Sequence, residues 1–171
     1  MKKPFRQGWL DSLCGIYSIV NCDKIINGSN ERDSQNLFDD IIKYLHMQNK
    51  LKDIVIGGVY NKDMISLLDN FSKEKFKWKP SGTGFKNINE YWSFLFSFFS
   101  SYEKSCVILS IGGIDNHLTV SYSISEKKIN LFDSSGYNSI MKSRCKIYPY
   151  LKEDKFVIYP SQSFICWKEQ K

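Results

Sequence analysis

Apolar residues in the first part of the chain recur at the spacing of amphipathic helices. Across 13–26 they return every three or four positions, and Asn27-Gly28 follows as a pair that commonly ends a helix. The same spacing resumes after Asp33 or Ser34, either of which can cap a second helix. The pattern therefore predicts two successive amphipathic helices.

Further helical segments precede a change of pattern near residue 104. Asn61 can cap a third helix, and the segment 88–102 predicts a fourth. Aromatic residues lie on so many sides of the fourth helix that we expect it to be buried on several faces. Between these helices, 55–59 is interpreted as a short strand or turn and 80–84 as a loop.

Short β-strands follow residue 104. Gly112-Gly113 and the segment 125–127 are predicted hairpin connections, so neighbouring strands are expected to be antiparallel. The expected fold class is α+β, with an N-terminal helical half and a C-terminal antiparallel sheet half in one domain over 1–171. The predicted strands are 106–111, 117–124, 128–132, 156–159 and 164–167.

Composition and charge narrow the class of protein. With 42% hydrophobic and 25% charged residues the chain can form a buried core, and no apolar run approaches the roughly 20 residues of a membrane span. No Sec-type apolar run follows the first lysines, so a cytoplasmic protein is expected, with export as an effector by another route left open. The net charge of +6 comes from dispersed lysines, and we predict no nucleic-acid binding.

The five cysteines are an odd number without a C-x-x-C pair, which favours reduced thiols over a disulfide framework. They are scattered along the chain, so neither a metal site nor a cofactor is predicted. Cys14 is the candidate for chemistry, and Cys22, Cys106, Cys145 and Cys166 are interpreted as core residues.

Cys14 lies near the start of the first predicted helix. There the helix dipole and a neighbouring imidazolium would favour the thiolate, which is the nucleophilic form of cysteine. Asp11 and Ser12 can cap this helix, and Gly15 is expected to leave room for a substrate.

His117 is the candidate base for this thiol because it opens a predicted strand directly after a turn. His46 lies in a polar helix end and is expected to be exposed. A histidine base needs an acceptor on its second ring nitrogen. An unbroken antiparallel register that pairs 122 with 128 places Asp133 opposite His117, so we predict that these two residues are neighbours.

Gln7 is the candidate donor for the oxyanion that forms when a nucleophile attacks an acyl carbon, together with the backbone N–H of Cys14. Trp9, Asp115 and Asn116 flank these residues in the sequence and are predicted to line the cleft. Each of these three is equally compatible with an exposed loop position.

These stretches together resemble the papain-like cysteine peptidase superfamily, particularly compact bacterial members such as the double-glycine leader peptidases. The resemblance rests on Gln7, 11–15 (DSLCG), 116–120 (NHLTV) and Asp133, in that order. It implies a nucleophilic cysteine on the first helix of a helical half, and a histidine and an aspartate on the facing sheet. It also implies a thiol protease without a cofactor.

Three functions remain open at this point. The first is a peptidase that cleaves a peptide or isopeptide bond through an acyl-enzyme on Cys14. The second is an amidase, deamidase or acyltransferase that uses Cys14, His117 and Asp133 in the same way, as a toxin or effector. The third is a non-catalytic module that binds a protein partner.

Overall fold

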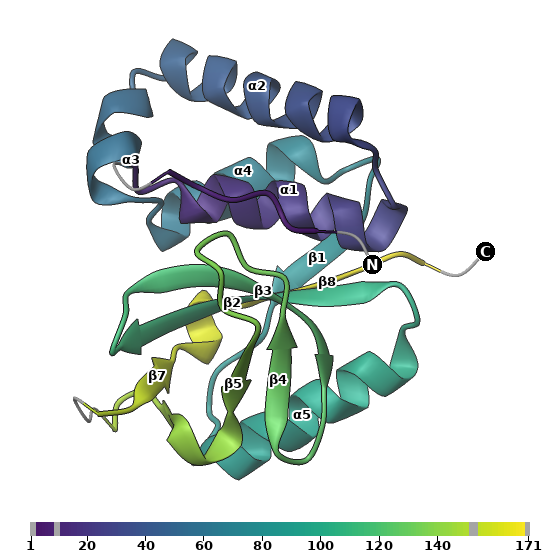
Figure 1. Cartoon of the computed structure of the whole chain (residues 1–171), viewed down its shortest axis with the longest axis vertical. Coiled ribbons are helices and arrows are strands. Elements are labelled where there is room, and N and C mark those ends of the chain that lie inside the picture. Colours follow the sequence, from purple (N-terminus) through teal and green to yellow (C-terminus); the bar gives the residue numbers. More distant parts are fainter. Residues whose placement is uncertain (1–2, 9–10, 151–153, 170–171) are drawn as a thin grey trace.

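Helices cover both faces of one mixed sheet in the computed structural model of the chain, which describes residues 3–8, 11–150 and 154–169 (Figure 1). Helices α1 to α4 lie together on one face, and α5 lies on the other. The described part of the chain is thus α+β with an N-terminal helical half, as predicted. The helices are α1 (Cys14–Asn27), α2 (Glu31–Met47), α3 (Leu51–Gly57), α4 (Asn61–Phe71) and α5 (Ile88–Ser101).

The helical half differs from the sequence prediction at two places. Asn30, not Asp33 or Ser34, caps α2, because its side chain accepts a hydrogen bond from the backbone N–H of Asp33. The segment 55–59, predicted as a strand or turn, instead contains the end of α3. The buried Ile54 anchors this short helix to the core, so tertiary packing overrides the β-branched local sequence.

The sheet is organised around β2, which pairs with β3 along one edge and with β8 and then β7 along the other. All described pairings are antiparallel except that of β6 with β7. The strands are β1 (Lys77–Pro80), β2 (Ser105–Gly113), β3 (His117–Ile124), β4 (Lys128–Leu131), β5 (Ser139–Met141), β6 (Cys145–Ile147), β7 (Phe156–Ile158) and β8 (Phe164–Trp167).

The segment 80–84 was predicted to be a loop, but its first residue belongs to strand β1. Pro80 is the last residue of β1 and pairs with Phe164 of β8. A proline in this place is compatible with a sheet because β1 is an edge strand and needs no backbone donor on its outer side.

The predicted register of the β3–β4 hairpin is wrong. Ser121 pairs with Leu131, and the next pair is Ser123 with Asn130, so a β-bulge interrupts the ladder between them. Continuing the first pairing toward the start of β3 places Asp133 opposite Thr119 instead of His117. His117 is then the diagonal neighbour of Asp133, which long side chains can still bridge.

Alternate residues of β2 enter two separate hydrophobic cores. Cys106 and Ile108 belong to the core between the sheet and α1 to α4, whereas Val107 and Leu109 belong to the core beneath α5. Helix α5 buries one stripe and leaves Phe96 45% exposed, so the expectation that this helix is buried on several faces is wrong. Among the described residues, no helix is long and apolar enough to cross a membrane.

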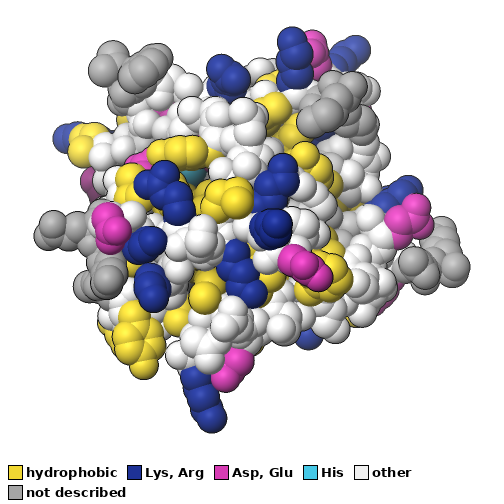
Figure 2. All heavy atoms as spheres, turned by 60° about the horizontal axis from the view of Figure 1, so that its bottom comes forward, with side chains coloured by type: hydrophobic (Ala, Val, Ile, Leu, Met, Phe, Trp, Pro, Cys, Tyr) yellow, Lys and Arg dark blue, Asp and Glu magenta, His cyan; other side chains and the backbone are white. Residues whose placement is uncertain are grey.

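Basic residues gather on the face that carries α5 and the 3-10 turn at 142–144. Figure 2 shows lysine and arginine side chains there, interspersed with hydrophobic ones. A cavity of about 750 Å³ on the surface includes four lysines in its lining, which the dispersed sequence positions did not suggest. They are Lys127, Lys142, Lys146 and Lys155.

Candidate active site

Cys14 is the first residue of α1 and is half-buried. The first backbone N–H groups of a helix have no partner inside the helix, so they create a positive field at this thiol. The N-cap residue, Leu13, makes no side-chain cap, which corrects the expectation that Asp11 and Ser12 cap the helix. Asp11 instead accepts a hydrogen bond from the backbone N–H of Leu13 at 3.1 Å, and the Ser12 hydroxyl donates to the carbonyl of Ile56 at 3.2 Å. These contacts fix the turn that presents Cys14.

Gly15 has a packing role that the sequence did not predict. A Cβ atom at this position would lie 2.7 Å from Val59 and 3.2 Å from Leu118. Protein atoms therefore occupy the space that Gly15 was expected to leave for a substrate. The absence of a side chain instead lets α1 approach β3 closely, and the Ser18 hydroxyl donates to the carbonyl of Leu118 at 3.0 Å across this contact.

His117 and Asp133 form a buried pair, as predicted from their placement on the hairpin. His117 Nε2 lies 2.7 Å from Asp133 Oδ2. The second carboxylate oxygen, Oδ1, accepts hydrogen bonds from the backbone N–H groups of Ser135 and Tyr137, at 2.8 and 2.9 Å. Both oxygens of Asp133 are therefore engaged, and the turn after β4 holds the carboxylate in one orientation.

Opposing effects set the pKa values of this pair. Burial alone would lower the pKa of the His117 imidazole, but hydrogen bonds to Asp133 and to Cys14 outweigh burial and raise it to about 10. Burial alone would raise the pKa of the Asp133 carboxyl, but the hydrogen bond and charge of His117 lower it below its usual value. At neutral pH, His117 is thus an imidazolium bonded to a carboxylate.

The remaining ring nitrogen of His117 is the one available to the thiol. Nε2 is bonded to Asp133, and the hydrogen bond with Cys14 contributes to the raised pKa of His117. Nδ1 is therefore the ring nitrogen that remains for the Cys14 thiol. An imidazolium beside a thiol favours its thiolate, so the arrangement can supply a nucleophile and a nearby proton donor.

The segment around Gln7 runs alongside this pair. The backbone N–H of Gln7 donates to the carbonyl of Ser134 at 3.2 Å, and its side-chain Oε1 accepts from the Ser134 hydroxyl at 3.3 Å. Asn21, which is buried on α1, exchanges two hydrogen bonds with the backbone of Phe5, at 2.9 and 3.2 Å. The structure thus brings Gln7 next to the residue that follows Asp133.

A cavity of about 310 Å³ lies between the Gln7 segment and the turn after Asp133. Because this turn belongs to the same loop that holds the carboxylate, the cavity adjoins the candidate site. Its lining residues are Arg6, Gln7, Gly8, Ser134 and Ser135.

Three residues predicted to line the cleft have different positions. Asp115 accepts a hydrogen bond from the Tyr137 hydroxyl at 3.1 Å, and the Tyr137 ring lies 6.3 Å from that of His117, so Asp115 reaches the edge of the site. Asn116 is exposed. Trp9 lies outside the described residues.

Tyr137 was missed by sequence reasoning, although it contacts this site twice. Its backbone N–H donates to Asp133, and its ring packs near His117. The only signal was its position directly after the Ser134-Ser135-Gly136 turn, which does not distinguish it from an ordinary loop tyrosine.

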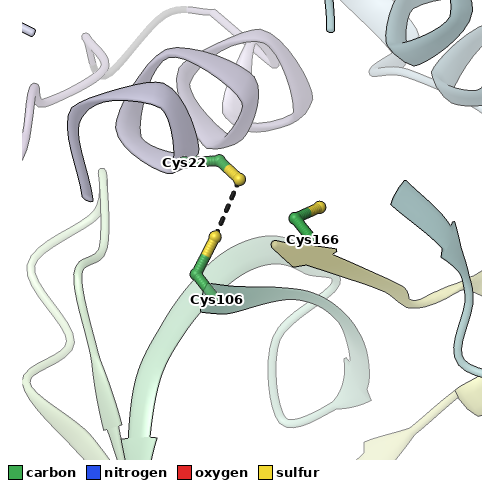
Figure 3. Close-up of side chains that lie close together, drawn as sticks. All are labelled: Cys22, Cys106 and Cys166. Atoms are coloured by element: carbon green, nitrogen blue, oxygen red, sulfur yellow. Dashed lines mark hydrogen bonds between the residues drawn. The ribbon is translucent and has the colours of Figure 1, made fainter. Parts of the chain in front are cut away.

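Three of the other four cysteines lie close together in space, whereas Cys145 lies in the core beneath α5. Cys22, Cys106 and Cys166 converge in the core, and their Sγ atoms all lie within 4.8 Å of one another (Figure 3). All three are buried in the core, as interpreted from the sequence, and of the described residues they are the set that could hold a metal ion.

The sequence matches no protein-family model, and no curated protein matches it.

Proposed function

We propose that this chain is a papain-like cysteine peptidase that cleaves a peptide or isopeptide bond through an acyl-enzyme on Cys14. The observation that carries the proposal is the hydrogen bond from His117 Nε2 to Asp133 at 2.7 Å, which leaves Nδ1 for the thiol. A histidine held by a carboxylate on one nitrogen and facing a thiol with the other is the arrangement that nucleophilic cysteine catalysis needs.

The first half of the proposed reaction forms a thioester. The Cys14 thiolate attacks the carbonyl carbon, and the carbonyl oxygen takes the electron pair as an oxyanion. When the oxyanion collapses, the C–N bond breaks and the leaving nitrogen takes the proton from His117 Nδ1. The products of this half-reaction are a free amine and an acyl group on Cys14, with His117 left neutral.

The second half releases the acid. Neutral His117 takes a proton from water as the water oxygen attacks the thioester carbon, and the C–S bond then breaks. Cys14 returns as a thiolate and His117 as an imidazolium, so the cycle consumes one water for each bond cleaved. Asp133 keeps the ring oriented throughout and stays ionised because its pKa is lowered.

The oxyanion would be stabilised at the N-terminus of α1. The backbone N–H of Cys14 points from the first position of the helix, where the dipole favours negative charge. Gln7 is the proposed side-chain donor, and its position beside Ser134 supports this role. A substrate would have to take the place of the weak 3.5 Å contact that Gln7 Nε2 makes with the carbonyl of Asp11.

The test uses a proteome-derived peptide library incubated with the full-length protein, and with Cys14→Ala as the matched control. Mass spectrometry then reads new peptide N-termini and changes at glutamine side chains in the same samples. New N-termini that require Cys14 are the expected result.

Two other outcomes would overturn the proposal. Conversion of glutamine to glutamate without new termini would assign the site to a deamidase. No Cys14-dependent change in the peptides, in a protein whose Cys14 also fails to alkylate selectively, would favour the non-catalytic module.

A further inference from the structure

Three thiols meet between the first helix and the sheet, away from the chemistry proposed above. Cys22 lies on α1, Cys106 on β2 and Cys166 on β8 (Figure 3). Cys106 and Cys166 are direct partners in the β2–β8 register, so both side chains leave the sheet on the same face. Cys22 faces them from α1, and its Sγ atom lies 2.7 Å from that of Cys106.

The cluster is closed to solvent and lies in an apolar environment. All three cysteines are fully buried, and they belong to the hydrophobic core that contains Ile19 and Phe164. Their Sγ atoms lie within 4.8 Å of one another. A trigonal site with metal–sulfur bonds of roughly 2.3 Å has its sulfur atoms about 4 Å apart. The three thiols therefore need only a side-chain adjustment that separates Cys22 from Cys106.

The ligand set selects the class of ion. Among the described residues, the group offers three sulfur atoms and no histidine, aspartate or glutamate. Structural zinc sites hold four ligands, and hard cations such as magnesium require oxygen. Soft sulfur ligands select Cu(I), which two or three of them satisfy.

We infer that Cys22, Cys106 and Cys166 form a binding site for a soft monovalent ion of the Cu(I) class. Each thiol that binds as a thiolate releases its proton to solvent, so the affinity rises with pH. Because the ligands come from α1, β2 and β8, the bound ion connects the helical half to the sheet. This site is independent of the proposed peptidase activity.

The test is an anaerobic titration of the full-length Cys14→Ser protein with Cu(I), in competition with a chromophoric Cu(I) chelator. The Cys14→Ser background removes the one thiol that is not buried. One tightly held ion per chain is expected by native mass spectrometry. Cys22→Ser, Cys106→Ser and Cys166→Ser should each weaken retention by roughly tenfold or more, whereas Cys145→Ser should leave it unchanged.

X-ray absorption at the copper edge identifies the atoms bound to the ion in the Cys14→Ser protein. It needs no cluster variant, so it tests the inference even if those variants fail to fold. Three sulfur neighbours are expected around the ion. Nitrogen or oxygen neighbours, no retained ion, or retention that depends equally on Cys145 would overturn the inference. Recovery of a Cys22–Cys106 disulfide from protein purified under reducing conditions would also overturn it, because two of the ligands would then be unavailable.

Discussion

His117 and Asp133 form their 2.7 Å hydrogen bond as diagonal neighbours, not as residues directly opposite one another on the hairpin. The β-bulge after Ser121 shifts the register, yet His117 and Asp133 remain within reach because the carboxylate leaves the end of β4 toward the start of β3. The pair therefore depends on the turn that holds Asp133 as much as on the strands. Tyr137 contributes to that turn through its backbone N–H.

The raised pKa of His117 can be observed directly. The chain has two histidines, so His46→Gln leaves His117 as the single imidazole signal in a nuclear magnetic resonance titration. We expect it to titrate near 10 in this background. Adding Asp133→Asn removes the carboxylate charge and should move the titration down toward 6.5, whereas Asp115→Asn should change it little. A His117 pKa near 6.5 in the His46→Gln protein would contradict the hydrogen-bonded pair of His117 and Asp133.

The same pair predicts how stability depends on pH. The folded pKa of His117 lies above its ordinary value of 6.5, so its contribution is complete below about pH 6.5 and is lost as the pH rises toward 10. The folded pKa of Asp133 lies below 3.8, so its contribution is present above that pH and is lost in acid. The two contributions are both complete between about pH 4 and 6.5.

Urea unfolding checks this dependence. The difference in the free energy of unfolding between the wild type and His117→Ala should be largest near pH 5 and should shrink by pH 9. His46→Gln is the matched control, because His46 is exposed on α2. A difference that stays constant from pH 5 to pH 9 would show that His117 does not gain its proton affinity from folding.

Gly15→Ala tests the close contact between α1 and its neighbours. The new methyl group would lie 2.7 Å from Val59, so we expect a loss of about 1 to 3 kcal/mol in the free energy of unfolding. Val59→Ala removes the atoms in the way, so Gly15→Ala should cost less in that background, as a double-mutant cycle measured by urea unfolding would show. Equal costs in both backgrounds would mean that this contact does not limit the approach of α1.

Asn21→Ala tests how the Gln7 segment is held. Asn21 is buried and satisfies both the backbone N–H and the carbonyl of Phe5, so the substitution leaves polar groups without partners. A loss of about 1 to 3 kcal/mol is expected, measured by urea unfolding. Hydrogen exchange should also accelerate at the amide of Gln7, which bonds to Ser134. An unchanged exchange rate at Gln7 would show that its hydrogen bond to Ser134 does not depend on the hydrogen bonds between Asn21 and Phe5.

The sequence predicted the helix and strands that carry the site more accurately than it predicted the pairing between β3 and β4. The alternation of β3, the apolar spacing of α1 and the Asn27-Gly28 pair that ends α1 are local signals, so the observed bounds of α1 and β3 lie close to those predicted. The bulge after Ser121 has no signature in the alternation, which is why the register was wrong. The prediction that His117 and Asp133 are neighbours nevertheless holds, because a diagonal partner on the same face remains within reach.

Features that depend on several distant segments could not be predicted. The cysteine cluster joins α1, β2 and β8, and no spacing between Cys22, Cys106 and Cys166 marks it in the sequence. The packing role of Gly15 requires knowing that Val59 and Leu118 lie beside it. Tyr137 reaches the site because the loop after β4 extends toward α1 (Figure 1).

The central claim is that His117 makes Cys14 the reactive thiol of this chain, and limiting iodoacetamide tests it most directly. Intact protein and His117→Ala are alkylated at pH 6, and mass spectrometry reads which cysteine carries the label. We predict that Cys14 alone is labelled quickly in the intact protein, because reactive cysteines lie at helix N-termini beside an imidazolium, and that His117→Ala loses this labelling. Equal rates at Cys14 in the two proteins, or slow and uniform labelling of all five cysteines, would contradict the claim.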